Sequence, residues 1–205
     1  MKNFIKFILV GLGVVVAAEF QLGVIFRGDV IGYGITMLLY VVILSLAYGF
    51  LKFAHKKWPK AKADIYYFII LSIFGLLIEW FLLGTAPWLD NEANQFGMLA
   101  WWSALALVPR IFTDSTASEA LKKRIKITLL VFSFGTLALV IPLHFMGQNT
   151  PAYIIFFFSW LITYLSLYFA YIPYLAKDEY IAKTKTFRNV SIIFFVLAGI
   201  TQFIK

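Results

Sequence analysis

The sequence predicts an all-α integral membrane protein, a polytopic transmembrane helical bundle of about seven spans. Two observations indicate this fold class. Of 205 residues, 62% are hydrophobic and only 14% are charged, whereas a soluble domain is closer to half apolar and a quarter charged. The apolar residues also form long runs, with no Asp, Glu, Lys or Arg from Val30 to Leu51 or from Ile127 to Ala176. We expect a single integral membrane domain over residues 1–205.

The predicted spans are apolar segments separated by short polar connections. A helix needs about 20 apolar residues to cross the hydrocarbon of a bilayer, so a chain of this length has room for roughly six to eight spans. The segments are 4–25, 31–51, 65–86, 96–113, 125–146, 152–175 and 188–204. The fourth and seventh of these segments are short.

Basic residues are concentrated in alternate connections between these spans. Because Lys and Arg are retained on the cytoplasmic side of a membrane, the pattern predicts an N-terminus inside and a C-terminus outside, in the cytoplasmic (inner) membrane. This placement also accounts for the net charge of +8 without a nucleic acid partner. The basic groups are Lys2 and Lys6; Lys52, Lys56, Lys57, Lys60 and Lys62; Lys122, Lys123, Arg124 and Lys126; and Lys177, Lys183, Lys185 and Arg188.

The first apolar segment has an alternative interpretation. Lys2 and Lys6, an apolar run through Val16, and the small residues Ala17 and Ala18 also resemble a secretory signal with a cleavage site. We expect a retained anchor helix instead.

Ionisable residues inside the bilayer are the best pointers to function, because each is costly unless it faces protein or water. Glu19 and Glu79 lie roughly 22 and 21 Å from the cytoplasmic ends of the first and third spans, at 1.5 Å per residue. His144 and Gln202 occupy a similar level of the fifth and seventh. The pattern predicts a shared site, in which a desolvated carboxyl can exchange a proton or hold a cation. Glu19, Glu79 and His144 are therefore the candidates for proton exchange or acid–base catalysis.

A second group of residues is predicted to bind the substrate: Trp80, Trp101, Trp102, Arg110 and Gln202. Arg110 lies near the inner end of its span, and we expect it to snorkel toward the cytoplasmic headgroups. The alternative is an ion pair or a phosphate contact within the bundle. Pro109 and Pro142 are candidate hinges.

Several kinds of chemistry lack their sequence signatures. The chain has no cysteine, and it contains no Walker loop, GxSxG elbow, HExxH helix or dinucleotide glycine fingerprint. Its Glu and His residues do not have the helical spacing of metal ligands. We expect no metal ion and no cofactor.

Three functions fit these features. A small transporter or channel would use the outer-half carboxylates for proton or cation coupling while paired hairpins rearrange. An intramembrane enzyme would act on a lipid or isoprenoid-like substrate near the outer leaflet, with Glu79 and Glu19 as acid and base. A non-catalytic subunit of a membrane complex would bind partner helices through the same polar groups. The first two are favoured nearly equally, and the expected partners are membrane lipids and a small ion or hydrophobic small molecule.

Overall fold

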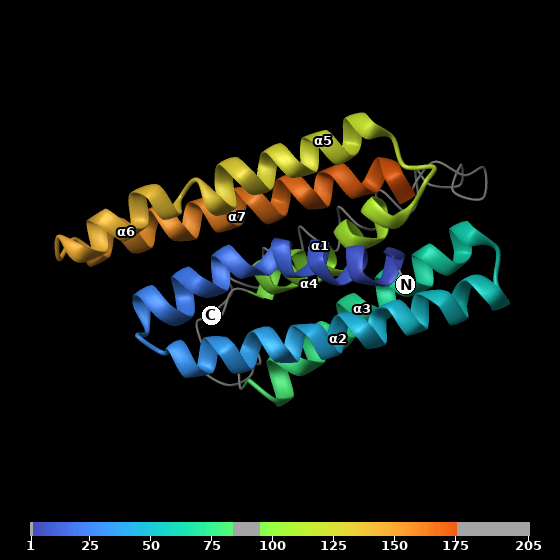
Figure 1. The fold of residues 1–205 in the computed structure, drawn as a ribbon, viewed down its shortest axis with the longest axis horizontal. Helices are drawn as coiled ribbons and strands as arrows, with labels where there is room; N and C mark the ends of the chain where they lie inside the picture. Colours follow the sequence, from blue (N-terminus) through green and yellow to red (C-terminus); the bar gives the residue numbers. More distant parts are fainter. Residues whose placement is uncertain (1, 84–94, 176–205) are drawn as a thin grey trace, which may run out of the picture.

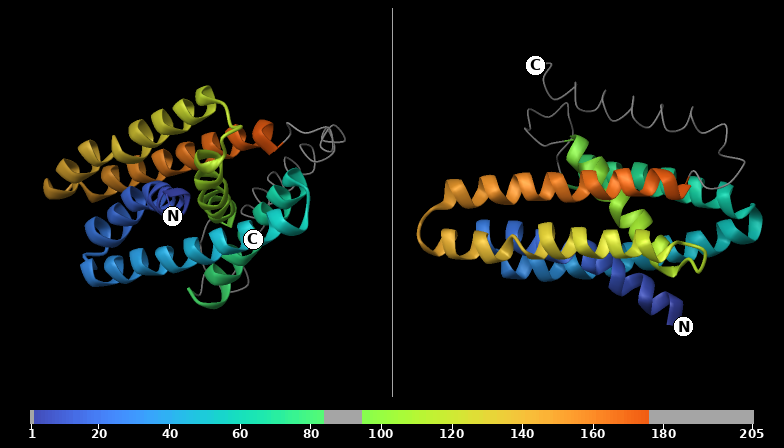
Figure 2. Two further views of the ribbon diagram at one scale, coloured as in Figure 1. Left: turned by 45° about the vertical axis from the view of Figure 1, so that its right-hand side comes forward. Right: turned by 90° about the horizontal axis from the view of Figure 1, so that it is seen from above.

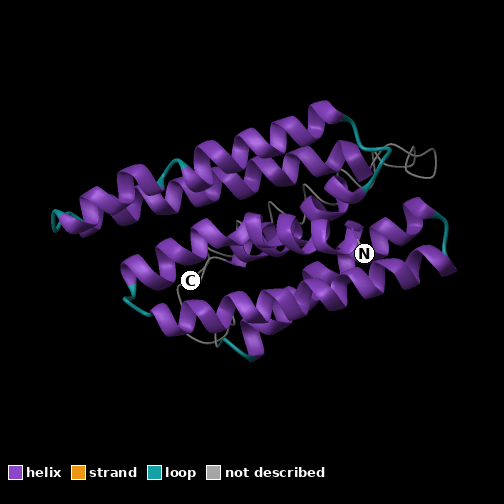
Figure 3. Ribbon diagram, viewed as in Figure 1, coloured by secondary structure: helices purple, strands orange, loops and turns teal. Residues whose placement is uncertain are grey.

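The computed structural model describes residues 2–83 and 95–175, which are helical apart from short turns and contain no strand (Figure 1 and Figure 3). The predicted all-α class is therefore confirmed for this part of the chain. In chain order the elements are α1 (Lys2–Glu19), η1 (Phe20–Phe26), α2 (Val30–Lys57), α3 (Lys60–Phe81), α4 (Gln95–Thr113), α5 (Glu119–Thr128), η2 (Leu129–Phe134), α6 (Leu137–Phe145) and α7 (Asn149–Leu175).

The lengths and compositions of these helices are those of an integral multi-pass membrane protein. In the described residues, 5 helical stretches are long and apolar enough to cross a membrane: Lys2–Phe26, Val30–Lys57, Lys60–Phe81, Glu119–Phe145 and Asn149–Leu167. A further apolar helix over Met98–Thr113 is shorter. The predicted seventh segment, 188–204, lies outside the described residues.

One face of α2 shows directly how the outer surface is built. Large apolar side chains recur on it every three or four residues and are between 55% and 78% exposed. A stripe of this length would be unfavourable in water, but it suits a helix whose outer face contacts lipid. Its residues are Ile31, Ile35, Leu38, Val42 and Leu46.

The helix α4 forms the centre of the bundle. Every residue from Leu99 to Phe112 is buried, and α4 packs against α1, α3 and α7 (Figure 2). A helix that is apolar on all sides requires such enclosure. Because α4 touches helices that are distant in the sequence, side chains on different faces of it reach different partners.

Short turns make the helices run back and forth. The Asp29 carboxylate caps α2 by accepting a hydrogen bond from the Gly32 backbone N–H at 2.7 Å, and Gly147 has the positive φ of 75° that the turn between α6 and α7 needs. The basic α2–α3 turn and the start of α5 lie at one end of the bundle, and the η1–α2 and α6–α7 turns lie at the other (Figure 1). These two basic connections, which the structure describes, therefore share an end.

Two helices contain a π-helical turn. The segment η1 continues α1, and η2 continues α5 before a turn at 135–136 leads into α6. Gly135 is required at that turn, because a Cβ there would lie 2.2 Å from the Val131 carbonyl oxygen. Pro142, which the sequence analysis named as a candidate hinge, lies inside α6. The helix of the fifth apolar segment is instead interrupted at 135–136, before this proline.

Candidate functional site

The first carboxylate of the site, Glu19, ends α1 where the π-helical segment η1 begins. The buried Tyr40 hydroxyl, on α2, donates a hydrogen bond to Glu19 Oε1 at 2.7 Å. Trp101, on α4, donates its indole N–H to the Tyr40 oxygen at 3.1 Å. An indole nitrogen can only donate, so the order of donation runs from Trp101 to Tyr40 to Glu19.

The second carboxylate, Glu79, lies near the end of α3. Trp102, next to Trp101 on α4, donates its indole N–H to Glu79 Oε1 at 3.2 Å. Consecutive helical residues point about 100° apart, given 3.6 residues per turn, so the two tryptophans reach different neighbours. Gly75 lies against Trp102, and a Cβ there would lie 2.1 Å from the ring carbon Cδ2. The glycine therefore makes room for the indole that meets Glu79.

The donors of the two carboxylates lie next to each other. The rings of Tyr40, which donates to Glu19, and Trp102, which donates to Glu79, are 6.1 Å apart between their centroids. Both glutamates are half-buried. Residues from α1, α2, α3 and α4 thus hold two acidic groups against neighbouring aromatic donors, a phenol and an indole, and the positive charge of Arg27 also acts on Glu19.

The remaining predicted residues have other surroundings. Trp80 follows Glu79 on α3 and is half-buried. His144, near the end of α6, packs edge-on against the ring of Phe26, with centroids 6.1 Å apart, and its buried Nδ1 has no hydrogen-bond partner among the described residues. Gln202 lies outside the described residues. The structure therefore brings Glu19, Glu79, Trp101 and Trp102 together, with His144 in an aromatic environment on other helices.

The expectation that Arg110 snorkels to the headgroups is wrong. Arg110 is 4% exposed, and its guanidinium donates to both carboxylate oxygens of Asp64, from Nε at 2.7 Å and from Nη2 at 2.9 Å. Its Nη2 also lies 3.3 Å from Asp114 Oδ2. The partners lie within the bundle, so the charge is satisfied there and does not need to reach the membrane surface.

These residues belong to a larger ion-pair network at the other end of α3. His55 Nε2 lies 2.8 Å from Asp64 Oδ1, Lys60 Nζ lies 3.0 Å from Asp114 Oδ1, and the Tyr174 hydroxyl donates to Asp114 Oδ2 at 2.5 Å. The network ties α2, α3, α4 and α7 together. Asp64 and Glu79 are 15 positions apart on α3, a separation of about 22 Å.

The environment of Asp114 favours its charged form. Burial raises the pKa of this carboxyl, but hydrogen bonds from the Tyr174 hydroxyl, the Thr116 backbone N–H and the Lys60 ammonium outweigh burial and hold the pKa well below its ordinary value. Asp114 is therefore an anion at neutral pH and balances the cations around it.

Two polar contacts between α3 and α4 lie between the network and the carboxylate site. The Tyr67 hydroxyl donates to the Ala106 carbonyl oxygen at 3.0 Å, and the hydroxyl oxygens of Ser72 and Ser103 are 3.3 Å apart. Hydrogen bonds between helices satisfy groups that lipid could not. The same pair of helices thus connects both charged regions.

Sequence reasoning missed Asp64, Asp114 and Tyr40. A signal for the aspartates was present, because each lies four residues after a cation, Lys60 or Arg110, which is the spacing of a helical ion pair. Tyr40 carried no such signal, because one tyrosine in an apolar, aromatic-rich span resembles any other.

The fold and this site define a multi-pass helical bundle with acidic groups held between its helices. Comparisons of the chain with protein-family models, with curated proteins and with solved structures find no match.

Proposed function

We propose that the protein is a small membrane transporter or channel in which Glu19 and Glu79 bind the proton or cation that is coupled to transport. The observation that carries this proposal is the convergence of two carboxylates, from helices α1 and α3, on neutral donors beside the central helix α4.

The electrostatics of the pair support a binding role. Two negative charges held near each other and partly out of water repel, so a proton or a small cation between them relieves the repulsion. The hydrogen bonds from Tyr40 and Trp102 orient the carboxylates without neutralising them. A site of this kind can load and release a positive charge.

The ion-pair network supports a closed state at the opposite end. Asp64, Arg110 and Asp114 are buried, and with His55 and Tyr174 they connect four helices, so we infer that this end is closed while the carboxylates lie near the other. A transporter needs a binding site that is open to one side of the membrane while a barrier closes the other side. The proposal includes the seven-span topology with the N-terminus inside, in which the network faces the cytoplasm and the carboxylates lie in the outer half.

Transport is preferred to lipid chemistry because aromatic side chains pack against the described part of the site. Tyr40, Trp101 and Trp102 are buried beside the carboxylates, whereas an isoprenoid-like substrate requires a pocket on the order of several hundred Å³.

The test is ion flux through the purified full chain in vesicles that contain a pH-sensitive dye, with proton, sodium or potassium gradients imposed in turn. We expect flux in the wild type and its loss in Glu19→Gln and Glu79→Gln, which preserve an acceptor for the Tyr40 and Trp102 hydrogens. The matched control is Glu119→Gln, since that carboxylate is 86% exposed. Wild-type flux in both glutamine variants, or no flux in the wild type under any gradient, contradicts the proposal.

A further inference from the structure

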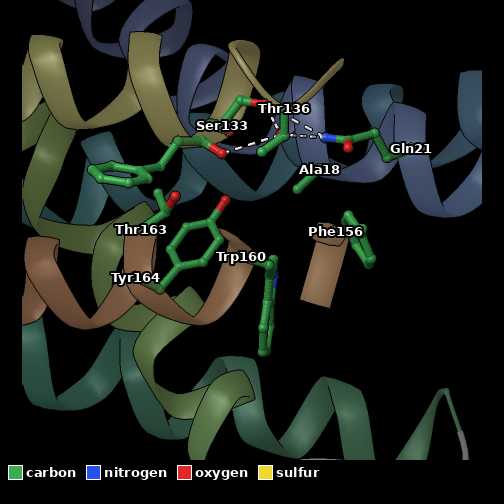
Figure 4. Close-up of a pocket in the computed structure, with 9 residues that line it drawn as sticks. Ala18, Gln21, Ser133, Thr136, Phe156, Trp160, Thr163 and Tyr164 are labelled. Atoms are coloured by element: carbon green, nitrogen blue, oxygen red, sulfur yellow. Dashed lines mark hydrogen bonds between the residues drawn. The ribbon is translucent and has the colours of Figure 1, made fainter. Parts of the chain in front are cut away.

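A small cavity lies between the end of α1, the π-helical segments and α7 (Figure 4). It leaves about 10 Å³ for the centre of a water-sized molecule, which is close to the smallest space that holds one buried water. The polar groups that line it are Gln21, Ser133, Thr136, Thr163 and Tyr164, and aromatic rings complete the wall.

Gln21 presents an unused acceptor at this cavity. Its side chain is 1% exposed, and its Nε2 donates to the Ala17 carbonyl oxygen at 3.1 Å and lies 3.4 Å from the Ser133 carbonyl oxygen. Carbonyl oxygens accept only, so they fix which end of the amide is the nitrogen. The Oε1 atom has no hydrogen-bond partner among the described residues, and leaving a buried acceptor unpaired costs about 1–3 kcal/mol.

Three of the other hydroxyls have already used their hydrogens. Tyr164 donates to the Val14 carbonyl oxygen at 2.7 Å, Thr163 donates to the Ser159 carbonyl oxygen at 2.8 Å, and Thr136 donates to the Ser133 carbonyl oxygen at 3.0 Å. What these three groups can still offer an occupant is oxygen lone pairs. An occupant that meets them and Gln21 Oε1 therefore donates hydrogen bonds.

Both π-helical segments contribute to the cavity. Gln21 is the second residue of η1, and Phe132 and Ser133 belong to η2. A π-helical turn is rare and occurs frequently at functional sites, because the extra residue re-aims side chains and backbone. Two of them meeting at one polar cavity is a second, independent indication of a binding site.

We propose that this cavity binds one hydrogen-bond-donating species of the size of water, either water itself or ammonium, seated against Gln21 Oε1. The aromatic rings of Trp160 and Tyr164 line the cavity, and aromatic rings can contact a small cation as well as a neutral donor. Neither Glu19 nor Glu79 is among the residues that line the cavity. The proposal therefore goes beyond the transport function and does not depend on it.

The first arm of the test is a high-resolution structure of the full chain, wild type and Gln21→Leu. We expect a density peak about 2.7–3.2 Å from Gln21 Oε1, the range of a hydrogen bond, and its loss in the variant. A dry cavity in the wild type, or a peak that stays in place in Gln21→Leu, overturns the proposal.

The second arm identifies the donor by thermal unfolding in ammonium chloride and in choline chloride at equal concentration. A ligand that binds only the folded state raises Tm as its concentration grows. A saturable rise with ammonium alone, lost in Gln21→Leu, assigns ammonium; a density peak without such a rise assigns water.

A second variant keeps the test decisive if Gln21→Leu does not fold. Thr163→Val nearly preserves the shape of the side chain and removes a hydroxyl oxygen that could accept a hydrogen bond from the occupant. That hydroxyl donates its own hydrogen within α7. It should weaken the density peak and any ammonium-dependent rise. Thr113→Val is the matched control, because that hydroxyl also bonds within its own helix but belongs to α4, away from the cavity. Equal behaviour of the two threonine variants contradicts the proposal.

Discussion

Gly75 and Trp102 are in such close contact that a methyl group on Gly75 would lie 2.1 Å from the indole carbon Cδ2. This contact places the indole N–H against Glu79. Because a ring cannot move aside as a flexible chain end can, we expect Gly75→Ala to force Trp102 out of its position and to destabilise the protein by about 1–3 kcal/mol. Unfolding in detergent, followed by tryptophan fluorescence, measures the loss.

Gly49→Ala is the control for that prediction. Gly49 lies inside α2, and a Cβ there would have no neighbour within 4 Å. Alanine is favoured over glycine in a helix by about 1 kcal/mol, so this variant should be as stable as the wild type or more so. Equal stability of the Gly75→Ala and Gly49→Ala variants would show that Trp102 is not held by this contact.

The buried ion pairs of Arg110 give a second prediction. Arg110→Ala leaves Asp64 with His55 alone and Asp114 with Lys60 and Tyr174, and breaking a buried ion pair in this way costs up to about 3–5 kcal/mol of stability. Arg110→Lys keeps the charge but cannot donate to both oxygens of Asp64 as the guanidinium does, and it should lose an intermediate amount. Denaturant unfolding of each variant measures the differences.

The control for the ion-pair prediction is the pair of Lys122 and Glu119, in which the carboxylate is 86% exposed. Glu119→Gln should cost no more than about 1 kcal/mol, as is usual for a pair with an exposed partner. An Arg110→Ala variant no less stable than Glu119→Gln would mean that the network contributes little.

Asp114 gives a prediction about pH. Its pKa is lower in the folded chain than in the unfolded chain, so its contribution to stability is complete above the unfolded value of about 3.9. The contribution is lost as the pH falls below that value toward the folded pKa. We expect Asp114→Asn to reduce the loss of stability on acidification from about pH 5 downward, as measured by Tm across a pH series.

Tyr174→Phe distinguishes the contribution of Asp114 from the destabilisation that low pH causes elsewhere in the protein. It removes one hydrogen bond to Asp114 and leaves the carboxylate in place. Its pH dependence should fall between those of the wild type and Asp114→Asn. Identical acid profiles for all three chains would count against Asp114 as the group responsible.

The absence of cysteine from the chain permits a clean test of orientation. Lys57 and Gln148 are both exposed and lie at the turns on opposite ends of the bundle. If the N-terminus is inside, a membrane-impermeant maleimide should label Gln148→Cys in intact cells and Lys57→Cys only after permeabilisation. The reverse pattern would invert the proposed topology, and labelling of both in intact cells would contradict it.

The helical, membrane-embedded character of the chain could be predicted from the sequence. Apolar runs such as Val30–Leu51 specify helices whatever their neighbours, because in lipid each helix must satisfy its backbone hydrogen bonds internally. The basic connections likewise predicted which turns share an end of the bundle. The count of seven spans and the orientation remain predictions.

The partners of Arg110, by contrast, depended on how the helices pack. Asp64 is 46 residues away in the chain, and nothing local says that α3 and α4 bring the two side chains together. Snorkelling is the sensible expectation for an arginine near a helix end when no partner is known. The packed structure supplies the partner and reverses the expectation.

Glu19, Glu79 and Gln21 show the same division. The sequence positions of Glu19 and Glu79 predicted that two acids would lie in the outer part of apolar helices, because hydropathy and helical rise are local properties. Only the tertiary structure decided that separate neutral donors, Tyr40 and Trp102, meet the two glutamates, and that Gln21, which the sequence did not single out, lines a cavity. The reason is that a side chain's neighbours come from helices far apart in the chain, and packing around α4 selects them.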